Sequence, residues 1–320
     1  MRQEKRYRLV TKGDFDGLVC AVLLKDLDMI EDIKFVHPRD VESGKMEITC
    51  NDITAGIPYV ESAHIVFDNY PGAVKKVKGK RPNYICSARA SSTARIIYNC
   101  FGGKKRFPHI SDEMLSEADR GYSARFTTDE ILYPANRELL NYLIDQRTGL
   151  EKFKKYKTSC DQFMMSLVNY CKDHTILEIL SLPDVEERLE TYFSSTEQCK
   201  AQILRCATVY YNLVVVDMRK EKVIYPGNRF IIYALFPECN VSLQAVSEVN
   251  NKILFIAGKS VIDRSYKANI GKIMSKYGGG GHANAGTCQV INDRAEDVLR
   301  GLIRKLKYGL FKNLFVGYFN

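Results

Sequence analysis

Aspartates gather near the ends of apolar, strand-like runs in the first seventy residues. Asp14 and Asp16 follow the run YRLVT (7–11), Asp52 follows KMEITC (45–50), and Asp68 follows HIVF (64–67). Ligands of open α/β sheets bind beyond the carboxyl ends of the strands, so we expect these four carboxylates to converge there. Converging carboxylates repel one another, and a hard divalent cation is the usual compensation. Aspartate also favours turns wherever strands end, which leaves a purely structural role open.

A second feature is a run of four glycines followed by a histidine, in KYGGGGHANAG (276–286). Successive backbone N–H groups in such a run can face an anion, and the missing Cβ atoms allow a phosphate to come close. The run lacks the Lys-Ser/Thr ending of a P-loop, and it follows a predicted helix (266–277) instead of opening a Rossmann unit. An arginine just before that helix could clamp a phosphate. The predicted substrate-binding residues are therefore Arg264, Ser265, Gly278, Gly279, Gly280, Gly281 and His282. A flexible turn and a merely exposed arginine are the alternatives.

The elements that must position these residues form two blocks. Strand-like runs alternate with helical ones up to about residue 100, which favours a mainly parallel sheet in an α/β domain. Residues 137–205 have a helical pattern, and β character returns from residue 208 in VYYNLVVVDM, RFIIYALF, NVSLQAVSEV and KILFIAGKS. We predict an α/β protein whose N-terminal domain, residues 1–190 with its connecting helices, precedes a smaller α/β substrate-binding domain at residues 205–320.

Composition and charge narrow the class of protein. The 320 residues carry a net charge of +9, which is compatible with a phosphate-bearing partner, although the basic residues are spread along the chain. The ten cysteines show no CxxC pair or metal-ligand spacing, so we expect reduced thiols. No apolar run is long enough to span a bilayer, and we expect a cytoplasmic protein with no membrane partner. The sequence leaves open whether the chain forms a homo-oligomer.

Several segments together resemble one known family. DRSYKANIGKIMSKYGGGGHANAG is similar to the signature of the DHH-associated substrate-binding domain, and VTKGDFDGLVCAVLL resembles the first motif of DHH phosphoesterases. FDNY falls where that family has its Asp-His-His, and SSTARIIYNCFGG and EADRGYSARF resemble later segments. The resemblance covers nearly the whole chain. The family that it resembles includes RecJ-like nucleases, NrnA-like oligoribonucleases, cyclic-dinucleotide phosphodiesterases and exopolyphosphatase-like proteins.

The resemblance implies phosphoester hydrolysis with two Mn²⁺ or Mg²⁺ ions, which activate water and stabilise charge at phosphorus. It implies metal ligands at Asp14, Asp16, Asp52 and Asp119, with Asp52 as the bridging candidate, and a catalytic set of Asp14, Asp16, Asp52 and Asp68. The glycine segment would hold a short oligonucleotide, a dinucleotide or polyphosphate.

The metal half of this pattern is incomplete. Thr11-Lys12-Gly13 stands where the family has a histidine before its first aspartates, and Asp68-Asn69-Tyr70 replaces Asp-His-His. Loss of imidazole ligands weakens a Mn²⁺ site. An alternative is that the Lys12 ammonium neutralises Asp14 and Asp16 in place of a metal. We therefore expect a DHH-type relative that binds a phosphate-bearing ligand with impaired or altered hydrolysis. The alternative is an active Mn²⁺- or Mg²⁺-dependent phosphodiesterase with an oxygen-ligand metal site.

Overall fold

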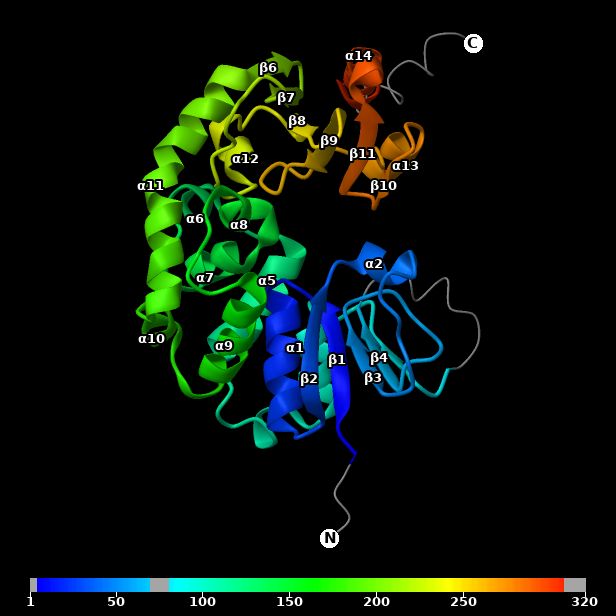
Figure 1. Cartoon of the computed structure of the whole chain (residues 1–320), viewed down its shortest axis with the longest axis vertical. Coiled ribbons are helices and arrows are strands. Elements are labelled where there is room, and N and C mark those ends of the chain that lie inside the picture. Colours follow the sequence, from blue (N-terminus) through cyan, green and yellow to red (C-terminus); the bar gives the residue numbers. More distant parts are fainter. Residues whose placement is uncertain (1–4, 70–80, 308–320) are drawn as a thin grey trace. The chain divides into compact units, whose positions relative to one another are not determined.

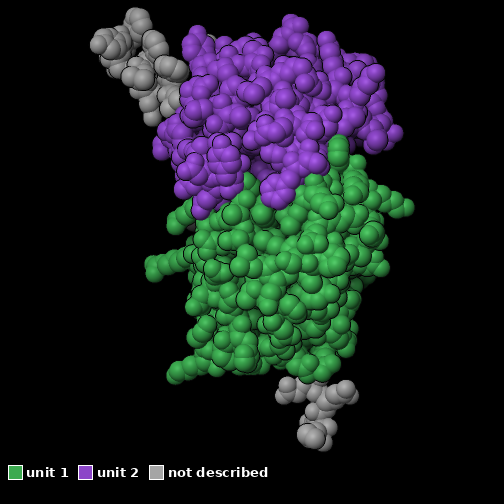
Figure 2. Space-filling view, turned by 90° about the vertical axis from the view of Figure 1, so that its left-hand side faces the viewer, with its two compact units in different colours: residues 1–125, 134–191 green, residues 126–133, 192–320 purple. Residues whose placement is uncertain are grey.

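A computed structural model of the chain describes residues 5–69 and 81–307, except the side chains of Arg39, Tyr122 and Ser123. Residues 1–125 and 134–191 form unit 1, whereas residues 126–133 and 192–320 form unit 2 (Figure 2). Across the described ranges, no helix has both the length and the apolar character needed to cross a membrane.

Unit 1 is built on a five-stranded sheet in the order β2-β1-β3-β4-β5, and every strand pair in it is parallel (Figure 1). The strands are β1 (Tyr7–Lys12), β2 (Ile30–Val36), β3 (Asp52–Ala55), β4 (Ile65–Asp68) and β5 (Tyr84–Cys86). The helices that begin in unit 1 are α1 (Phe15–Asp26), α2 (Pro38–Glu42), α4 (Thr93–Cys100), α5 (Asp112–Ser123), α7 (Asn136–Ile144), α8 (Leu150–Phe153), α9 (Cys160–Asp173), α10 (Ile176–Leu180) and α11 (Pro183–Cys206), with the 3-10 turns η1 (Gly103–Lys105) and η2 (Gln146–Thr148). The parallel sheet confirms the predicted α/β class.

Local sequence explains where the two helices nearest the strand ends begin. Asp14 caps α1, because its carboxylate accepts a hydrogen bond from the backbone N–H of Gly17 at 3.0 Å. Ser92 caps α4 in the same way through the N–H of Arg95. The first ten residues of α1 are all buried, as expected for an apolar helix that packs along β1 and β2 (Figure 1). Helix α1 therefore starts soon after the carboxyl end of β1, and α4 follows β5 after residues 87–92.

Unit 2 contains a six-stranded mixed sheet in the order β10-β11-β9-β8-β7-β6. Its strands are β6 (Ala207–Tyr210), β7 (Leu213–Asp217), β8 (Val241–Glu248), β9 (Lys252–Lys259), β10 (Gly280–Gly281) and β11 (Ala285–Ile291). Its helices are α6 (Thr128–Leu132), α12 (Ile231–Leu235), α13 (Ile270–Ser275) and α14 (Ala295–Lys307), with the 3-10 turn η3 (Asn292–Arg294). The apolar stripe of α14 packs in a core with β7, β8 and α13, so this stripe has a structural role.

Three predicted elements differ from the structure. KMEITC (45–50) is not a strand, and RFIIYALF contains the short helix α12, which buries its apolar residues as a helical turn. A short apolar run fits either a buried strand or a buried helix, so periodicity alone did not separate them. The helix predicted at 266–277 is shorter and begins after Asn269, whose side chain accepts a hydrogen bond from the N–H of Lys272.

Candidate functional site

Asp14 and Asp16 lie together beyond the carboxyl end of β1, as predicted. Asp16 is 4% exposed, and its two oxygens accept hydrogen bonds from the backbone N–H groups of Thr93 at 3.0 Å and Ala94 at 2.8 Å. Asp16 therefore connects the start of α1 to the start of α4. Burial raises the pKa of the Asp16 carboxyl, while the nearby Lys12 ammonium and the two backbone donors oppose that rise.

Asp68 and Asn69 lie at the carboxyl end of β4 and are each 2% exposed. The Asp68 carboxylate accepts a hydrogen bond from the Tyr84 hydroxyl at 2.9 Å. The Asn69 side-chain oxygen accepts one from the Thr93 hydroxyl at 3.0 Å, so Asn69 and Asp16 both contact Thr93. Tyr70, which stands at the last position of the family's Asp-His-His pattern, lies outside the described residues.

Asp119 lies on α5 and contacts the beginning of α4. Its carboxylate accepts hydrogen bonds from the Ser92 hydroxyl at 2.6 Å and from Arg95 Nε and Nη2 at 3.1 and 2.7 Å. The guanidinium binds the carboxylate with two donors, which is a strong and directional arrangement. As placed here, Asp119 holds α5 against α4.

Asp52 is not at the carboxyl edge, so the expectation that it joins the other aspartates is wrong. It is the first residue of β3 and pairs in register with Arg8, whereas the carboxyl end of β3 is followed by Gly56. The cause is a turn in which Asp52 N–H donates to the Thr49 carbonyl and Thr49 N–H donates to the Asp52 carboxylate. That turn ends the irregular segment 45–50, and the strand starts after it.

At this opposite edge Asp52 has a structural partner. Arg8 Nε and Nη2 donate to its two carboxylate oxygens at 2.6 and 3.0 Å, and the Asp52 side chain is 1% exposed. Burial would raise the pKa of this carboxyl, but the hydrogen bonds from Arg8 and Thr49 outweigh it and lower the pKa below its usual value. The pair ties β1 to β3.

We expect Asp52→Ala to lower the free energy of unfolding by about 2 kcal/mol, because it leaves half-buried Arg8 without its carboxylate. Urea unfolding followed by circular dichroism measures this loss. Glu61→Ala is the matched control, since its ion pair with Arg81 is exposed and should contribute less than about 1 kcal/mol. Equal losses for the two variants would contradict the structural role of Asp52.

Lys12 is a cation at the carboxyl edge, beside Asp14. Its Nζ lies 3.3 Å from Asp14 Oδ2, and its side chain is 18% exposed. A Cβ atom at Gly56 would lie 2.8 Å from Lys12 Cε and 3.5 Å from Lys12 Nζ. Gly56 also has a φ of 66°, in the left-handed region that favours glycine. Sequence reasoning singled out Lys12 but missed Gly56, which belongs to no quoted motif, and Thr93, which lies in the quoted segment SSTARIIYNCFGG but was not singled out.

As arranged, the described residues do not fit a two-metal centre. Among residues 5–69 and 81–307, no three His, Cys, Asp or Glu side chains are grouped so that they could hold a metal ion. The aspartates have suitable oxygen ligands, but Asp16 and Asp119 are engaged by backbone or guanidinium donors. A divalent ion at Asp14 would have to compete with the Lys12 ammonium for the same oxygens.

The glycine segment forms a tight hairpin, β10–β11, packed against α13. Gly280 pairs with Thr287 and Gly281 with Gly286. A Cβ atom at Gly279 would lie 2.0 Å from the Thr287 carbonyl oxygen, and one at Gly281 would lie 2.3 Å from the Ala285 carbonyl oxygen. Close backbone packing therefore requires glycine at 279 and 281, so the run is not a flexible turn.

Gly280 is different, because a Cβ atom there would meet no atom within 4 Å and its φ is not positive. Neither packing nor backbone conformation explains this glycine. Its place in the run is consistent with the predicted close approach of a ligand to the backbone.

The other predicted binding residues lie at the same end of the second sheet. Ser265 Oγ accepts a hydrogen bond at 2.7 Å from Nδ2 of Asn240, the residue just before β8. Arg264 is exposed, and its Nε donates to the Val261 carbonyl. The exposed His282 accepts a hydrogen bond at Nδ1 from the Asn284 N–H, and Asn284 in turn bonds to the end of β9. The structure thus places Arg264, Ser265 and the glycine hairpin at the same end of the second sheet.

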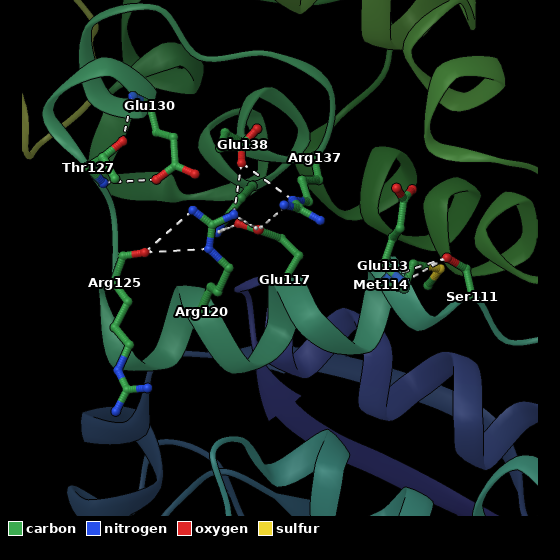
Figure 3. A network of polar contacts seen from close by, with 11 residues as sticks. Ser111, Glu113, Met114, Glu117, Arg120, Arg125, Thr127, Glu130, Arg137 and Glu138 are labelled. Atoms are coloured by element: carbon green, nitrogen blue, oxygen red, sulfur yellow. Dashed lines mark hydrogen bonds and ion pairs between the residues drawn. The ribbon is translucent and has the colours of Figure 1, made fainter.

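A cluster of charged side chains surrounds Glu117, which belongs to the same EADRG segment as Asp119 (Figure 3). Glu117 is fully buried on α5 and accepts a hydrogen bond from Asn141 at 2.7 Å. Arg120 and Arg137 approach it at 3.9 and 3.8 Å, and both pair more closely with Glu138. Burial raises the pKa of Glu117 to about 7. The sequence prediction considered only Asp119 in this segment and missed Glu117.

Comparison with known proteins shows a strong similarity to a solved structure. The pGpG-specific phosphodiesterase PggH from Vibrio cholerae is 48% identical to this chain, with 95% of this chain and 100% of that protein covered and a TM-score of 0.82. The DHH domain of a protein from a family of ribosomal proteins is 13% identical with a TM-score of 0.56, and the match covers 95% of this chain and 87% of that one. The second similarity shows the fold alone. No family model and no curated protein matches the chain.

Proposed function

The chain belongs to the DHH phosphoesterase family, and we propose that it is a phosphodiesterase that acts on linear dinucleotides such as pGpG. The observation that carries this proposal is the 48% identity to a pGpG-specific phosphodiesterase over the full length of that protein. Identity at this level over both units favours a shared ligand class. The glycine hairpin, which is predicted to bind a phosphate, also supports a phosphate-bearing ligand.

Within unit 1, the carboxyl edge of the sheet supplies the charged groups. Asp14 and Asp16 follow β1, Asp68 ends β4, and the starts of α1 and α4 face the same edge. Helix N-termini favour anions, and they offer a polar environment for a ligand phosphate. Because these acids are not grouped as a metal centre in the described part of the chain, we assign Asp14, Asp16 and Asp68 to the charged surroundings of the ligand.

The proposal is tested by incubating the full chain with pGpG, a cyclic dinucleotide, a longer oligoribonucleotide and polyphosphate, each with Mn²⁺, Mg²⁺ or EDTA, and separating the products. We expect pGpG to be hydrolysed fastest. Asp14→Asn should reduce that rate on the order of 100-fold, because the Lys12 ammonium loses the carboxylate that positions it while asparagine still caps α1. Lys45→Met, on an exposed side chain, is the control and should leave the rate unchanged.

Binding without efficient hydrolysis is the second candidate function, favoured by Asn69 at the end of β4 and by Lys12 beside Asp14. The variant Asn69→His/Tyr70→His separates the two. Wild-type hydrolysis of pGpG that is lost in Asp14→Asn contradicts the binding function. Hydrolysis that arises only in the double variant contradicts the proposal of an active phosphodiesterase.

A further inference from the structure

The carboxyl edge of the first sheet contains a largely buried positive charge on Lys12. Lys12 is the last residue of β1, and its side chain extends over Gly56, which follows the neighbouring strand β3. The Gly56 N–H donates to the Phe67 carbonyl at 2.9 Å, which holds this turn against β4. A side chain at Gly56 would press on the end of the lysine side chain. The absence of one leaves room for the ammonium group beside Asp14.

The surroundings of Lys12 include a buried polar group without a partner. In the described part of the chain, Asn69 Nδ2 makes no hydrogen bond although the residue is 2% exposed. The side-chain oxygen of Asn69 accepts a hydrogen bond from the Thr93 hydroxyl. That hydroxyl would lie 3.2 Å from a Cβ atom at Gly56. An unsatisfied buried N–H donor costs free energy that a bound acceptor recovers. The Asn69 amide and the Lys12 side chain thus lie around the same small region.

The charges in this region suit an anion better than a second cation. Asp14 is already paired with Lys12 and caps α1, and both oxygens of Asp16 are taken by the first backbone N–H groups near α4. Asp68 is the remaining acid, and it accepts a hydrogen bond from Tyr84. An amide N–H and an ammonium are donors for phosphate oxygens, and neither is a ligand for a metal ion.

We propose that Lys12 is a built-in cation that, together with the Asn69 amide, holds a phosphate oxygen of the ligand and takes the place of a divalent ion in that contact. The inference rests on the proposed dinucleotide ligand. It concerns how the phosphate is held, and it applies whether or not the phosphodiester is then cut. It also implies that divalent ions compete with the Lys12 ammonium for Asp14 and Asp16.

The first test measures pGpG affinity of the full chain by equilibrium dialysis in EDTA. We expect wild type to bind, and we expect Lys12→Met to weaken binding at least tenfold, about 1.4 kcal/mol. Methionine keeps the length and the apolar stem that packs over Gly56, and Lys45→Met is the control. Asn69→Asp, of nearly the same shape, should also weaken binding because a carboxylate repels the phosphate. Binding that requires Mn²⁺, or that is unchanged in Lys12→Met, overturns the inference.

The second test uses Mn²⁺ alone, titrated without nucleotide and followed by electron paramagnetic resonance. Lys12→Met should bind Mn²⁺ about tenfold more tightly than wild type, because Asp14 and Asp16 lose the nearby Lys12 ammonium as a competing cation. Equal Mn²⁺ affinities overturn the inference. If wild type binds no pGpG with either EDTA or Mn²⁺, the proposed ligand is wrong, and the Mn²⁺ comparison still decides the role of Lys12.

Discussion

Gly279→Ala is expected to destabilise unit 2 severely, by about 3 kcal/mol or more, whereas Gly280→Ala should leave its stability unchanged. A Cβ atom at Gly279 would lie 2.0 Å from the Thr287 carbonyl oxygen and 2.5 Å from Cys288 Cβ. Both atoms belong to β11, so relief requires the hairpin to separate. At Gly280 the same atom would meet nothing within 4 Å. Urea unfolding of the two variants measures the difference.

Gly280→Ala should instead weaken the binding of the ligand. If a phosphate contacts the backbone of β10, the added methyl group would hold it away from the N–H groups and weaken pGpG binding at least about tenfold. Equilibrium dialysis on the folded variant measures this change. Unchanged pGpG affinity would remove Gly280 from the binding site, and a loss of stability equal to that of Gly279→Ala would show that the hairpin packs differently.

The second large effect concerns pH. Glu117 has a pKa of about 7 in the folded chain, against an ordinary value of 4.5. The folded state therefore binds more protons than the unfolded state between these two values. Stability contributed by protonated Glu117 is fully present below about pH 4.5 and falls as pH rises to about 7, by about 3 kcal/mol for this shift. Glu117→Gln should remove that part of the pH dependence.

The measurement is the free energy of urea unfolding of the full chain from pH 4.5 to pH 8. Other acids also titrate in this range, so the difference between wild type and Glu117→Gln isolates the contribution of Glu117. Glu113→Gln, an exposed position on the same helix (Figure 3), should keep the wild-type slope. A slope in Glu117→Gln equal to that of wild type would show that burial does not hold this carboxyl neutral.

The regular elements were largely predictable because local patterns decide them. The run YRLVT, the apolar helix after it and the serine-capped SSTARIIYNC all form the expected elements. The strand β3 was misplaced because its four residues DITA are too short for a periodic signal. The Thr49–Asp52 turn that precedes it depends on side-chain hydrogen bonds, which hydrophobic patterning does not reveal.

The error at Asp52 shows why strand ends must be located before acids are assigned to a site. A shift of the strand from 45–50 to Asp52–Ala55 moved Asp52 from the carboxyl end of one strand to the amino end of another. Parallel strands place their carboxyl ends at one side of the sheet, so this shift moves Asp52 to the opposite end of the strands. Short sequence motifs did not indicate that Arg8 pairs with Asp52, because the two residues are far apart in sequence.

By itself, the sequence determined the α/β class, the family resemblance and the residue types at the motif positions, since these depend on local periodicity and on short contiguous motifs. Only the tertiary structure decided which residues meet. Lys12, Gly56, Asn69 and Thr93 come from four separate segments, and parallel strand order brings them to one edge. The glycine run likewise looked uniform in sequence. Backbone packing against β11 then separated Gly279 and Gly281, which need glycine for space, from Gly280, which does not.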